Sequence, residues 1–356
     1  MRRFLARSAG LSAAALGHVY TIWPYLERRR APLPSATIEE FRTTVADSVV
    51  GPVEISGLYL SGAGDRLTVI MHGLGGNTES GYMRAALSAC AQMGLSALLL
   101  NQRGADRRGH DFAHAGLIED LAHVLRDPRF ASFSEIALLG FSLGGHTALR
   151  YACVSPDPRL RRVAAICSPL DLAAASAAFD RSRFSVYRRH VLESLHQTYT
   201  AAYQRNPSGI EPYEARKIWR IREWDERVIA PRFGFPSALD YYQAMSVAPL
   251  LPELKVESLY LGAVHDPMVP RASVVSALAS AQKVSEIWVS RAGHLGFAPD
   301  FDLGFPDAPA GLFGQVLGWL WGDRHQNGFG AELHYPPTDA QTASQSSSGS
   351  ELDPAE

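Results

Sequence analysis

The sequence predicts an α/β fold in which helices cover a mostly parallel β-sheet. Short apolar runs alternate along the chain with longer segments of helical spacing, which is the pattern of such a sheet. Few glycines or prolines interrupt the helical segments. With 356 residues, 46% of them hydrophobic and 20% charged, the chain can bury a sizeable core as one large domain or two smaller ones.

Seven apolar runs are expected to be strands, and they occupy residues 53–60, 67–71, 96–100, 135–141, 162–167, 256–261 and 286–289. Five segments with helical spacing are expected to be helices, and they occupy residues 80–93, 117–125, 143–153, 271–281 and 312–321. In an open parallel sheet, ligands bind beyond the carboxyl ends of the strands. Residues that directly follow the strands are therefore the candidates for a site.

The alternation fails between about residues 171 and 250. Twelve of these 80 residues are aromatic, or 15%, compared with 10% of the whole chain. We expect a helical insertion that lies over the carboxyl edge of the sheet. It is either extra scaffold with a small core of its own or a cap that lines an apolar substrate site, and the pattern favours the cap.

A serine flanked by glycines stands where a predicted strand meets a predicted helix. The segment Gly140-Phe-Ser142-Leu-Gly144 has the setting of a nucleophile elbow. Such a turn strains the serine backbone, and the residues two before and two after it must be small so that strand and helix can approach. Gly140 and Gly144 meet that demand. The alternative is an ordinary helix N-cap serine in a glycine-rich turn.

A serine hydroxyl becomes a good nucleophile when a base takes its proton and a carboxylate orients that base. In this architecture the acid and then the base follow the serine along the chain. Asp266 follows the sixth predicted strand and His294 follows the seventh, so both should lie at the same sheet edge as Ser142. The alternatives are a turn-forming Asp-Pro and a surface histidine. His265 precedes the acid, which is the wrong order for the base.

An oxyanion hole needs backbone N–H groups aimed at the place where negative charge develops. Leu143, the residue after the serine, supplies one such group. The segment His72-Gly-Leu74-Gly-Gly76 follows the second predicted strand, and Leu74 is expected to supply the other. This glycine run lacks the third glycine of a dinucleotide-binding loop and the lysine of a P-loop, so no nucleotide site is indicated.

Together, these motifs resemble those of a known family. From residue 18 to residue 321 it resembles the α/β-hydrolases, and within them the YheT-like, or abhydrolase type 4, group of esterases and lipases. The segments that carry the resemblance are GHVYTIWP at 17–24, HGLGG at 72–76, NQRG at 101–104, GFSLGG at 140–145, SPLDL at 168–172, REWD at 222–225, DYY at 240–242, DP at 266–267 and GH at 293–294.

The resemblance implies an α/β-hydrolase domain at 17–324 with a cap at about 171–250, between an extension at 1–16 and another at 325–356. It implies the roles that the residues already suggested, with Ser142 as nucleophile, Asp266 as acid, His294 as base, and Leu74 and Leu143 as oxyanion donors. Two residues depart from the group, since His265 often has an aspartate counterpart and Ala292 a glycine. Neither departure removes a catalytic group.

Arg103, in the loop that follows a predicted strand, has two interpretations. It could bind a carboxylate or phosphate of a substrate, or it could pin the loop through Asp106 or Asp120. The structural interpretation is favoured, because Asn101 and Gly104 on either side are typical turn residues.

The predicted reaction is hydrolysis of a carboxylic ester, short-to-medium-chain or lipid-like, through an acyl-serine intermediate without a metal or cofactor. The alternatives are cleavage of a thioester or amide at the same site, and a hydrolase-like binding protein that has lost the chemistry. The resemblance implies that the dehalogenase and epoxide hydrolase branches would carry an aspartate in place of Ser142.

Charge and composition limit the partners. Lys and Arg number 34 against 36 Asp and Glu, a net charge of -2, which gives no broad positive field for nucleic acid. The cysteines at 90, 153 and 167 are too few and scattered for a disulfide framework or a zinc site, and are expected to be core residues. A small-molecule or lipid ester is the expected partner. The oligomeric state and a weak contact with a membrane surface stay open.

The two ends of the chain differ from the rest. Arginines at 2, 3 and 7 precede an uncharged stretch at 8–26, but polar residues and Pro24 interrupt the apolar character that a spanning helix needs. A cytoplasmic protein is therefore expected, with an N-terminally anchored or exported one as the alternative. Residues 336–356 hold one large aliphatic residue and are expected to be disordered.

Overall fold

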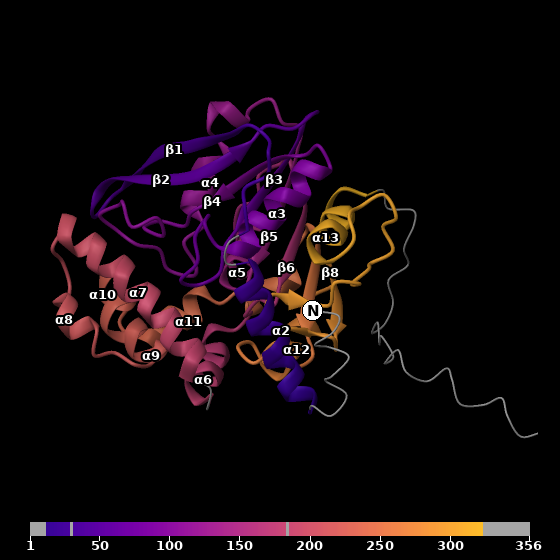
Figure 1. Ribbon diagram of the computed structural model, residues 1–356. Helices are drawn as coiled ribbons and strands as arrows, with labels where there is room; N and C mark the ends of the chain where they lie inside the picture. The colour runs from indigo at the N-terminus through magenta and orange to yellow at the C-terminus, as the bar shows by residue number, and fades with distance from the viewer. Residues whose placement is uncertain (1–11, 29–30, 183–184, 323–356) are drawn as a thin grey trace, which may run out of the picture.

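The computed structural model describes residues 12–28, 31–182 and 185–322, and it confirms the predicted α/β architecture (Figure 1). One eight-stranded sheet has the strand order β1-β2-β4-β3-β5-β6-β7-β8. The first two strands pair antiparallel with each other, and β2 pairs antiparallel with β4. From β4 to β8 all neighbours pair in parallel. The sheet is thus mostly parallel, as the sequence predicts.

The strands are β1 (Ile38–Asp47), β2 (Gly51–Leu60), β3 (Arg66–Met71), β4 (Ser96–Leu100), β5 (Glu135–Phe141), β6 (Leu160–Ile166), β7 (Glu257–Ala263) and β8 (Val284–Val289). The seven predicted strands are all present. The strand β1 was not predicted, because this edge strand is half exposed and buries few of its side chains, so it has no continuous apolar run. A two-stranded hairpin of β9 (Ala292–Gly293) and β10 (Gly296–Phe297) was also missed.

Helices cover both faces of the sheet. Those outside the insertion are α2 (Ala13–Arg28), α3 (Gly81–Gln92), α4 (Glu119–Leu125), α5 (Leu143–Val154), α12 (Val275–Leu278) and α13 (Leu312–Trp321), with short 3₁₀ turns η1 (Pro128–Phe130) and η4 (Arg271–Ser273). The single helix predicted at 271–281 is wrong. It breaks into η4 and α12 because Val274, at φ −125°, leaves helical geometry between them.

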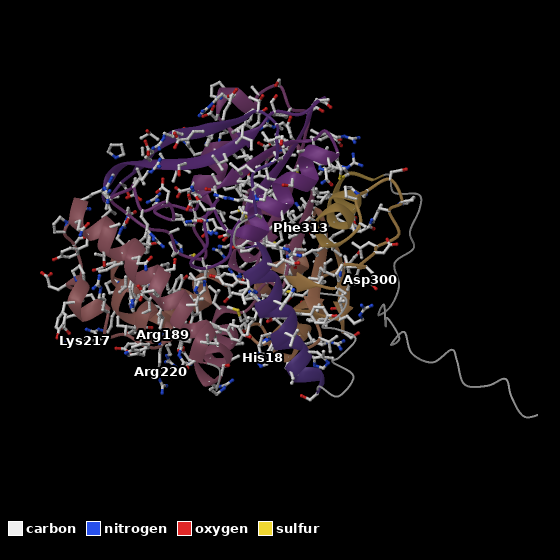
Figure 2. The ribbon with its side chains drawn as sticks, viewed as in Figure 1. His18, Arg189, Lys217, Arg220, Asp300 and Phe313 are labelled. Atoms are coloured by element: carbon white, nitrogen blue, oxygen red, sulfur yellow. The ribbon has the colours of Figure 1, made fainter. Side chains whose placement is uncertain are left out.

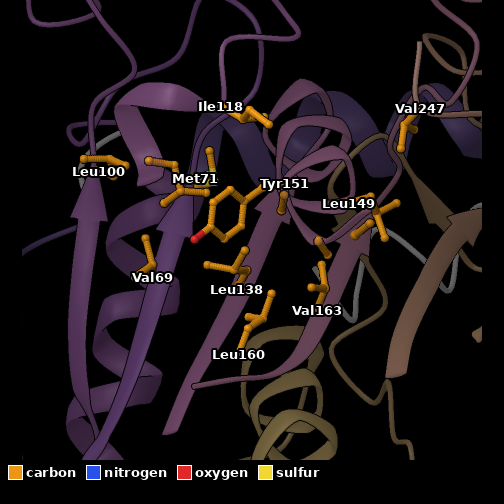
Figure 3. Close-up of a cluster of buried hydrophobic side chains, with 14 of the residues drawn as sticks. Val69, Met71, Leu100, Ile118, Leu138, Leu149, Tyr151, Leu160, Val163 and Val247 are labelled. Atoms are coloured by element: carbon orange, nitrogen blue, oxygen red, sulfur yellow. The ribbon is translucent and has the colours of Figure 1, made fainter. Parts of the chain in front are cut away.

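The core lies on both sides of the sheet, because successive side chains of a strand point to opposite faces. Val69 and Leu138 face the side covered by α4 and α5, where Tyr151 of α5 packs among them (Figure 3). Ile70 and Leu139, the next residues of the same strands, face α3 and α13. Because helices bury both faces of the central strands, the sequences of these strands are continuous apolar runs.

The predicted cap is present between β6 and β7, where helices gather on one side of the molecule (Figure 1). It consists of α6 (Leu172–Arg181), α7 (Ser185–Arg205), α8 (Pro212–Ala215), α9 (Ile221–Trp224), a π turn η2 (Asp225–Ile229), α10 (Ala230–Arg232), α11 (Ala238–Met245) and a 3₁₀ turn η3 (Ala248–Glu253). These helices share an apolar core of their own, in which Trp224, Tyr241 and Tyr242 are buried.

Arg103 is a structural residue, as predicted. Its buried guanidinium donates to both carboxylate oxygens of Asp120, at 3.0 and 2.7 Å, and to Asp47 at 2.6 Å. Although burial lowers the pKa of Arg103, the hydrogen bonds to these carboxylates raise it overall. Asp106, the other predicted partner, accepts a hydrogen bond from Ser56 instead.

The same cluster fastens the cap to the sheet. Asp111 accepts a hydrogen bond from Arg103 at 2.8 Å and two from Arg232 of α10, at 2.8 and 2.6 Å. The side chain of Asp111 is only 2% exposed. A buried carboxylate shared by two guanidinium groups therefore links a core loop to a cap helix.

The ends of the chain are only partly described. No helix within 12–28, 31–182 or 185–322 combines the length and apolar character needed to cross a membrane. The arginines at 2, 3 and 7 and the predicted disordered segment 336–356 lie outside the described residues.

Candidate active site

Ser142 stands at a sharp turn between β5 and α5. Its backbone has φ 51° and ψ −121°, a conformation that costs a non-glycine residue of order 1–3 kcal/mol. A Cβ on Gly140 would clash with Gly145, and a Cβ on Gly144 would clash with the carbonyl oxygens of β3 and the loop after it. The two glycines are therefore required by close approach, which is the reason the sequence analysis gave.

The side chain of Ser142 is not used as a helix cap. It accepts no capping hydrogen bond from α5, so the alternative of an ordinary N-cap serine is wrong. The Ser142 backbone N–H donates to Ile166 at the end of β6, at 2.8 Å, which fixes the turn to the neighbouring strand. The hydroxyl is thus held on a rigid support at the carboxyl edge of the sheet.

Asp266 and His294 meet at the same edge, beyond β7 and β8. His294 Nδ1 and Asp266 Oδ2 are 2.9 Å apart, and the two side chains are 7% and 1% exposed. The other carboxylate oxygen, Oδ1, accepts hydrogen bonds from the backbone N–H groups of Met268, at 2.8 Å, and Val269, at 2.9 Å. The carboxylate is oriented by three donors when His294 carries its proton on Nδ1.

The histidine is carried by a tight hairpin. β9 and β10 pair Gly293 with Gly296, which leaves His294 and Leu295 as the two residues of the turn. Leu295 has φ 61°, in the left-handed region that a non-glycine residue seldom adopts. The backbone N–H of His294 donates to the hydroxyl of Thr21 on α2, at 2.8 Å.

Cys167, expected to be an ordinary core residue, follows β6 and lies beside the Asp266–His294 pair. Its Sγ donates to the carbonyl oxygen of Gly293 at 3.8 Å. One ligand atom each of Cys167, Asp266 and His294 lies within 4.8 Å of the others. Burial raises the pKa of the Cys167 thiol well above its usual value, so the thiolate that binds a metal is disfavoured. The Asp266 and His294 donor atoms already bond each other, and this set fits a hydrogen-bonded pair better than a metal site.

The candidate oxyanion loop is held by His72. His72 Nδ1 donates to the carbonyl oxygen of Gly73 at 2.8 Å, and its Nε2 accepts from the backbone N–H of Gln102 at 3.1 Å. Burial lowers the pKa of His72 to about 4, so the ring is neutral and this tautomer satisfies both nitrogens. Gly76 N–H donates to the same Gly73 oxygen at 2.9 Å. The peptide from Gly73 to Leu74 is therefore fixed in orientation.

The N–H groups of Leu74 and Leu143 are available as donors. In a trans peptide the N–H points away from the carbonyl oxygen, so the bonds to Gly73 direct Leu74 N–H to the opposite side. Leu143 is the first residue of α5, where an N–H has no partner within the helix. Neither group donates to another group of the described ranges. A Cβ on Gly73 would lie 2.9 Å from Ser142 Cβ, so this loop lies against the serine.

The cap contacts the site at several points. Ser194 of α7 donates from its hydroxyl to the carbonyl oxygen of Gly75 at 2.7 Å, which ties the cap to the candidate oxyanion loop. Leu143, which follows Ser142, and Met268, which lies near Asp266, pack against the apolar core of the cap. The cap therefore extends to both sides of the edge where the predicted residues lie.

Sequence reasoning missed Thr21, Cys167 and Ser194. Thr21 lies within the GHVYTIWP segment, which carries part of the resemblance. That segment could have marked Thr21, although the resemblance assigned this residue no role. Cys167 directly follows a predicted strand, so its position could have marked it. Ser194 lies in the middle of a long helix, and no motif indicates its contact.

A groove lies away from Ser142, Asp266 and His294. It is an open groove of about 420 Å³ at the amino ends of the strands, opposite to Ser142. Glu135, Arg161 and Lys283 line it, and Arg161 pairs with Glu135 while Lys283 pairs with Glu257. Arg159 and Lys255 line it as well, and Arg159 pairs with Asp157.

Known proteins are similar to this chain in sequence. The alpha/beta hydrolase fold family matches residues 68–300. YheT of Escherichia coli (strain K12), whose name marks it as a candidate esterase, is 27% identical over 236 residues, which are 64% of this chain and 69% of that protein. A monoacylglycerol lipase of Saccharomyces cerevisiae is 24% identical over 249 residues, 66% of this chain and 55% of that protein.

Among solved structures, the esterase Pf2001 of Pyrococcus furiosus aligns with a TM-score of 0.48 at 16% identity, over 74% of this chain and 89% of that one. The predicted resemblance to α/β-hydrolases, with YheT among the relatives, is confirmed. With a mostly parallel sheet, a strained serine at the end of β5 and a family match over residues 68–300, the chain belongs to the alpha/beta hydrolase fold family.

Proposed function

We propose that the chain is a serine hydrolase that cleaves carboxylic esters through an acyl-serine intermediate. The observation that carries the proposal is the strained Ser142 at the same sheet edge as the buried Asp266–His294 pair. The relatives named as an esterase or a lipase support hydrolase chemistry at the level of the family.

In the proposed reaction, Ser142 Oγ attacks the acyl carbon while His294 Nε2 takes the hydroxyl proton. Asp266 accepts the hydrogen bond from Nδ1–H, which keeps Nε2 free to act as the base and stabilises the imidazolium that forms. The tetrahedral oxyanion is stabilised by the N–H groups of Leu74 and Leu143. Its collapse breaks the ester C–O bond, and the leaving alcohol takes the proton from Nε2.

The second half of the reaction repeats these roles with water. His294 Nε2 takes a proton from a water molecule, whose oxygen attacks the acyl carbon of the acyl-serine. Collapse of the second oxyanion releases the acid and returns the proton to Ser142 Oγ. Every step uses groups that the chain itself provides, so the proposed reaction needs no metal or cofactor.

The proposed substrates are uncharged or lipid-like esters with short-to-medium acyl chains. The aromatic residues of the cap suggested these substrates, but Trp224, Tyr241 and Tyr242 are buried in the core of the cap. Trp219 is 58% exposed. Leu143 and Met268, which join that core beside the site, are better candidates for an acyl wall. Each methylene buried there would gain about 0.8 kcal/mol.

Labelling with a fluorophosphonate probe tests the chemistry, because the probe forms a bond only with an activated serine. We expect the wild type to be labelled and Ser142→Ala to remain unlabelled. Ser155→Ala is the matched control, since Ser155 is exposed just beyond the other end of α5 and should leave labelling unchanged. A folded wild type that is not labelled would favour the hydrolase-like binding protein instead.

The acyl group is tested with p-nitrophenyl acetate, butyrate, hexanoate, octanoate and palmitate. An enclosed acyl wall predicts that kcat/KM rises to a maximum at intermediate chain length. A steady fall from acetate would rule out such a wall. Matched thioesters and anilides of the best acyl group then decide between an esterase and the thioesterase or amidase alternative.

A further inference from the structure

Thr21, on the N-terminal helix α2, holds the turn that carries His294. Its hydroxyl accepts a hydrogen bond from the His294 backbone N–H at 2.8 Å and donates one to the Gly17 carbonyl oxygen, also at 2.8 Å. Thr21 is buried, so water competes little for either bond. We propose that Thr21 is a positioning residue that keeps His294 aligned with Asp266. The inference rests on the proposed function, in which His294 is the base.

The turn itself shows why a partner is needed. In a two-residue hairpin turn, the N–H of the first turn residue takes no part in the pairing of the strands. For His294 this N–H is buried, and an unpaired buried donor is unfavourable. The second turn residue, Leu295, has φ 61° and is strained. A turn with a buried donor and a strained residue keeps its shape only if its surroundings hold it, and the Thr21 hydroxyl bonds the donor directly.

The rest of α2 lies in backbone contact with the same turn. A Cβ on Gly293 would clash with the Gly17 carbonyl oxygen and the Thr21 hydroxyl, and a Cβ on Gly296 would clash with the carbonyl oxygen of Tyr20. On its other side Gly17 packs against the backbone of His265, the residue before Asp266. The helix thus touches the loops of both the proposed base and the proposed acid.

The same helix also contacts the cap. His18 is labelled on α2 in Figure 2. Its Nδ1 lies 2.7 Å from the hydroxyl of Tyr187 on α7, and the two rings stack with centroids 5.7 Å apart. The helix is therefore held from the cap side and cannot easily shift away from the turn. The family match begins at residue 68, so it does not extend to Thr21.

Thr21→Val replaces the hydroxyl by a methyl group of similar size and tests the proposal. A displacement of about 1 Å in a catalytic group can cost on the order of 100-fold in rate, so we expect kcat to fall by about 10- to 100-fold. KM should stay within about 3-fold, because the residue does not touch the substrate. Thr21→Ser keeps the hydroxyl and should retain kcat within about 3-fold of wild type.

Thr68→Val is the matched control for a lost buried hydrogen bond. The Thr68 hydroxyl is fully buried and accepts from Trp321 Nε1 at 3.0 Å, near the amino end of β3. Its loss should lower the melting temperature as a structural substitution does, and kcat should stay at the wild-type value. If Thr21→Val also lowers only the melting temperature, Thr21 is structural and the proposal is overturned.

A second pair of variants covers the case in which Thr21→Val does not fold. Thr21→Ser and Thr21→Cys differ little in size, but sulfur is a much weaker acceptor than a hydroxyl oxygen. We expect the cysteine variant to lose kcat and the serine variant to keep it. Equal kcat values for the two would show that the hydrogen bond does not matter.

The rate of fluorophosphonate labelling separates this proposal from the proposed function. Labelling of Ser142 also needs the base, so Thr21→Val should be labelled more slowly than wild type whichever ester is the natural substrate. A labelled wild type with an equally fast Thr21→Val variant overturns the role of Thr21 alone. A folded wild type that is never labelled overturns both.

Discussion

At the scale of single residues, the hydrogen bonds of Asp266 determine what its replacement would do. Oδ1 of Asp266 accepts hydrogen bonds from the backbone N–H groups of Met268 and Val269, at 2.8 and 2.9 Å. In Asp266→Asn the amide oxygen would still accept both of these hydrogen bonds. The amide NH₂ group would then face His294 Nδ1 and donate to it. The ring would carry its proton on Nε2, the nitrogen that has to accept the serine proton.

We therefore expect Asp266→Asn to fold normally and to lose kcat by on the order of 10³- to 10⁴-fold. Asp171→Asn is the matched control, because Asp171 caps α6 by accepting from the Ala174 N–H at 2.9 Å and asparagine caps a helix equally well. Steady-state kinetics with an ester and a melting curve for each variant check this. Loss of activity in Asp171→Asn with near-normal Asp266→Asn would show that the acid is misassigned.

At the scale of elements, the attachment of the cap depends on a buried charge cluster. Asp111 joins Arg103 of a core loop to Arg232 of α10, and the three side chains are almost fully buried. Removing one member of such a cluster is costly because the charges that remain lose a partner without regaining water. The cap is thus held to the sheet by electrostatics as well as by apolar packing.

Asp111→Asn should lower the free energy of unfolding by about 1–3 kcal/mol, because it removes charge-assisted hydrogen bonds to Arg103 and Arg232. Arg103 keeps its pairs with Asp47 and Asp120, so its buried charge stays compensated. Urea denaturation followed by circular dichroism measures the loss. Glu40→Gln is the control, because Glu40 pairs with Arg108 at an exposed site where an ion pair contributes little. An Asp111→Asn variant as stable as Glu40→Gln would mean that the cluster does not stabilise the fold.

At the scale of the whole molecule, the buried His72 and the half-buried His114 make the fold sensitive to acid. Burial lowers the pKa of His72 to about 4, and burial together with the nearby Arg150 and Arg103 lowers that of His114 to about 3. In the unfolded chain a histidine titrates near 6.5. Below that pH the unfolded state binds protons that the folded state does not, so stability is full above about pH 6.5 and falls as the pH drops.

At pH 5 each of these two histidines should cost about 2 kcal/mol of folding free energy relative to pH 7.5. In His114→Phe the apolar ring can keep the contact with Phe233, whose centroid is 4.4 Å from that of His114. The difference in unfolding free energy between the two pH values should therefore shrink by about 2 kcal/mol in this variant. Urea denaturation at both pH values tests it, and an unchanged difference would exclude His114 as a source of acid sensitivity.

The sequence by itself determined the fold class and the positions of Ser142, Asp266 and His294. These depend on local signals, namely the alternation of apolar runs with helical spacing, the small residues around a tight turn, and the order of residues that follow parallel strands. The edge strand β1 was missed because it is half exposed, and the broken helix at 271–281 because its apolar spacing survives the break. The chemical roles of the three residues stay predictions until labelling and kinetics test them.

Only the tertiary structure decided which residues far apart in the sequence bond to one another. Thr21 bonds His294 from 273 residues away, Ser194 bonds Gly75 from 119 away, and Arg232 bonds Asp111 from 121 away. None of these pairs leaves a pattern along the chain, because a contact between distant segments depends on how helices pack rather than on local spacing. The physical reason is that periodicity reports which face of an element is buried, whereas the partner of a buried polar group is fixed only when the elements come together.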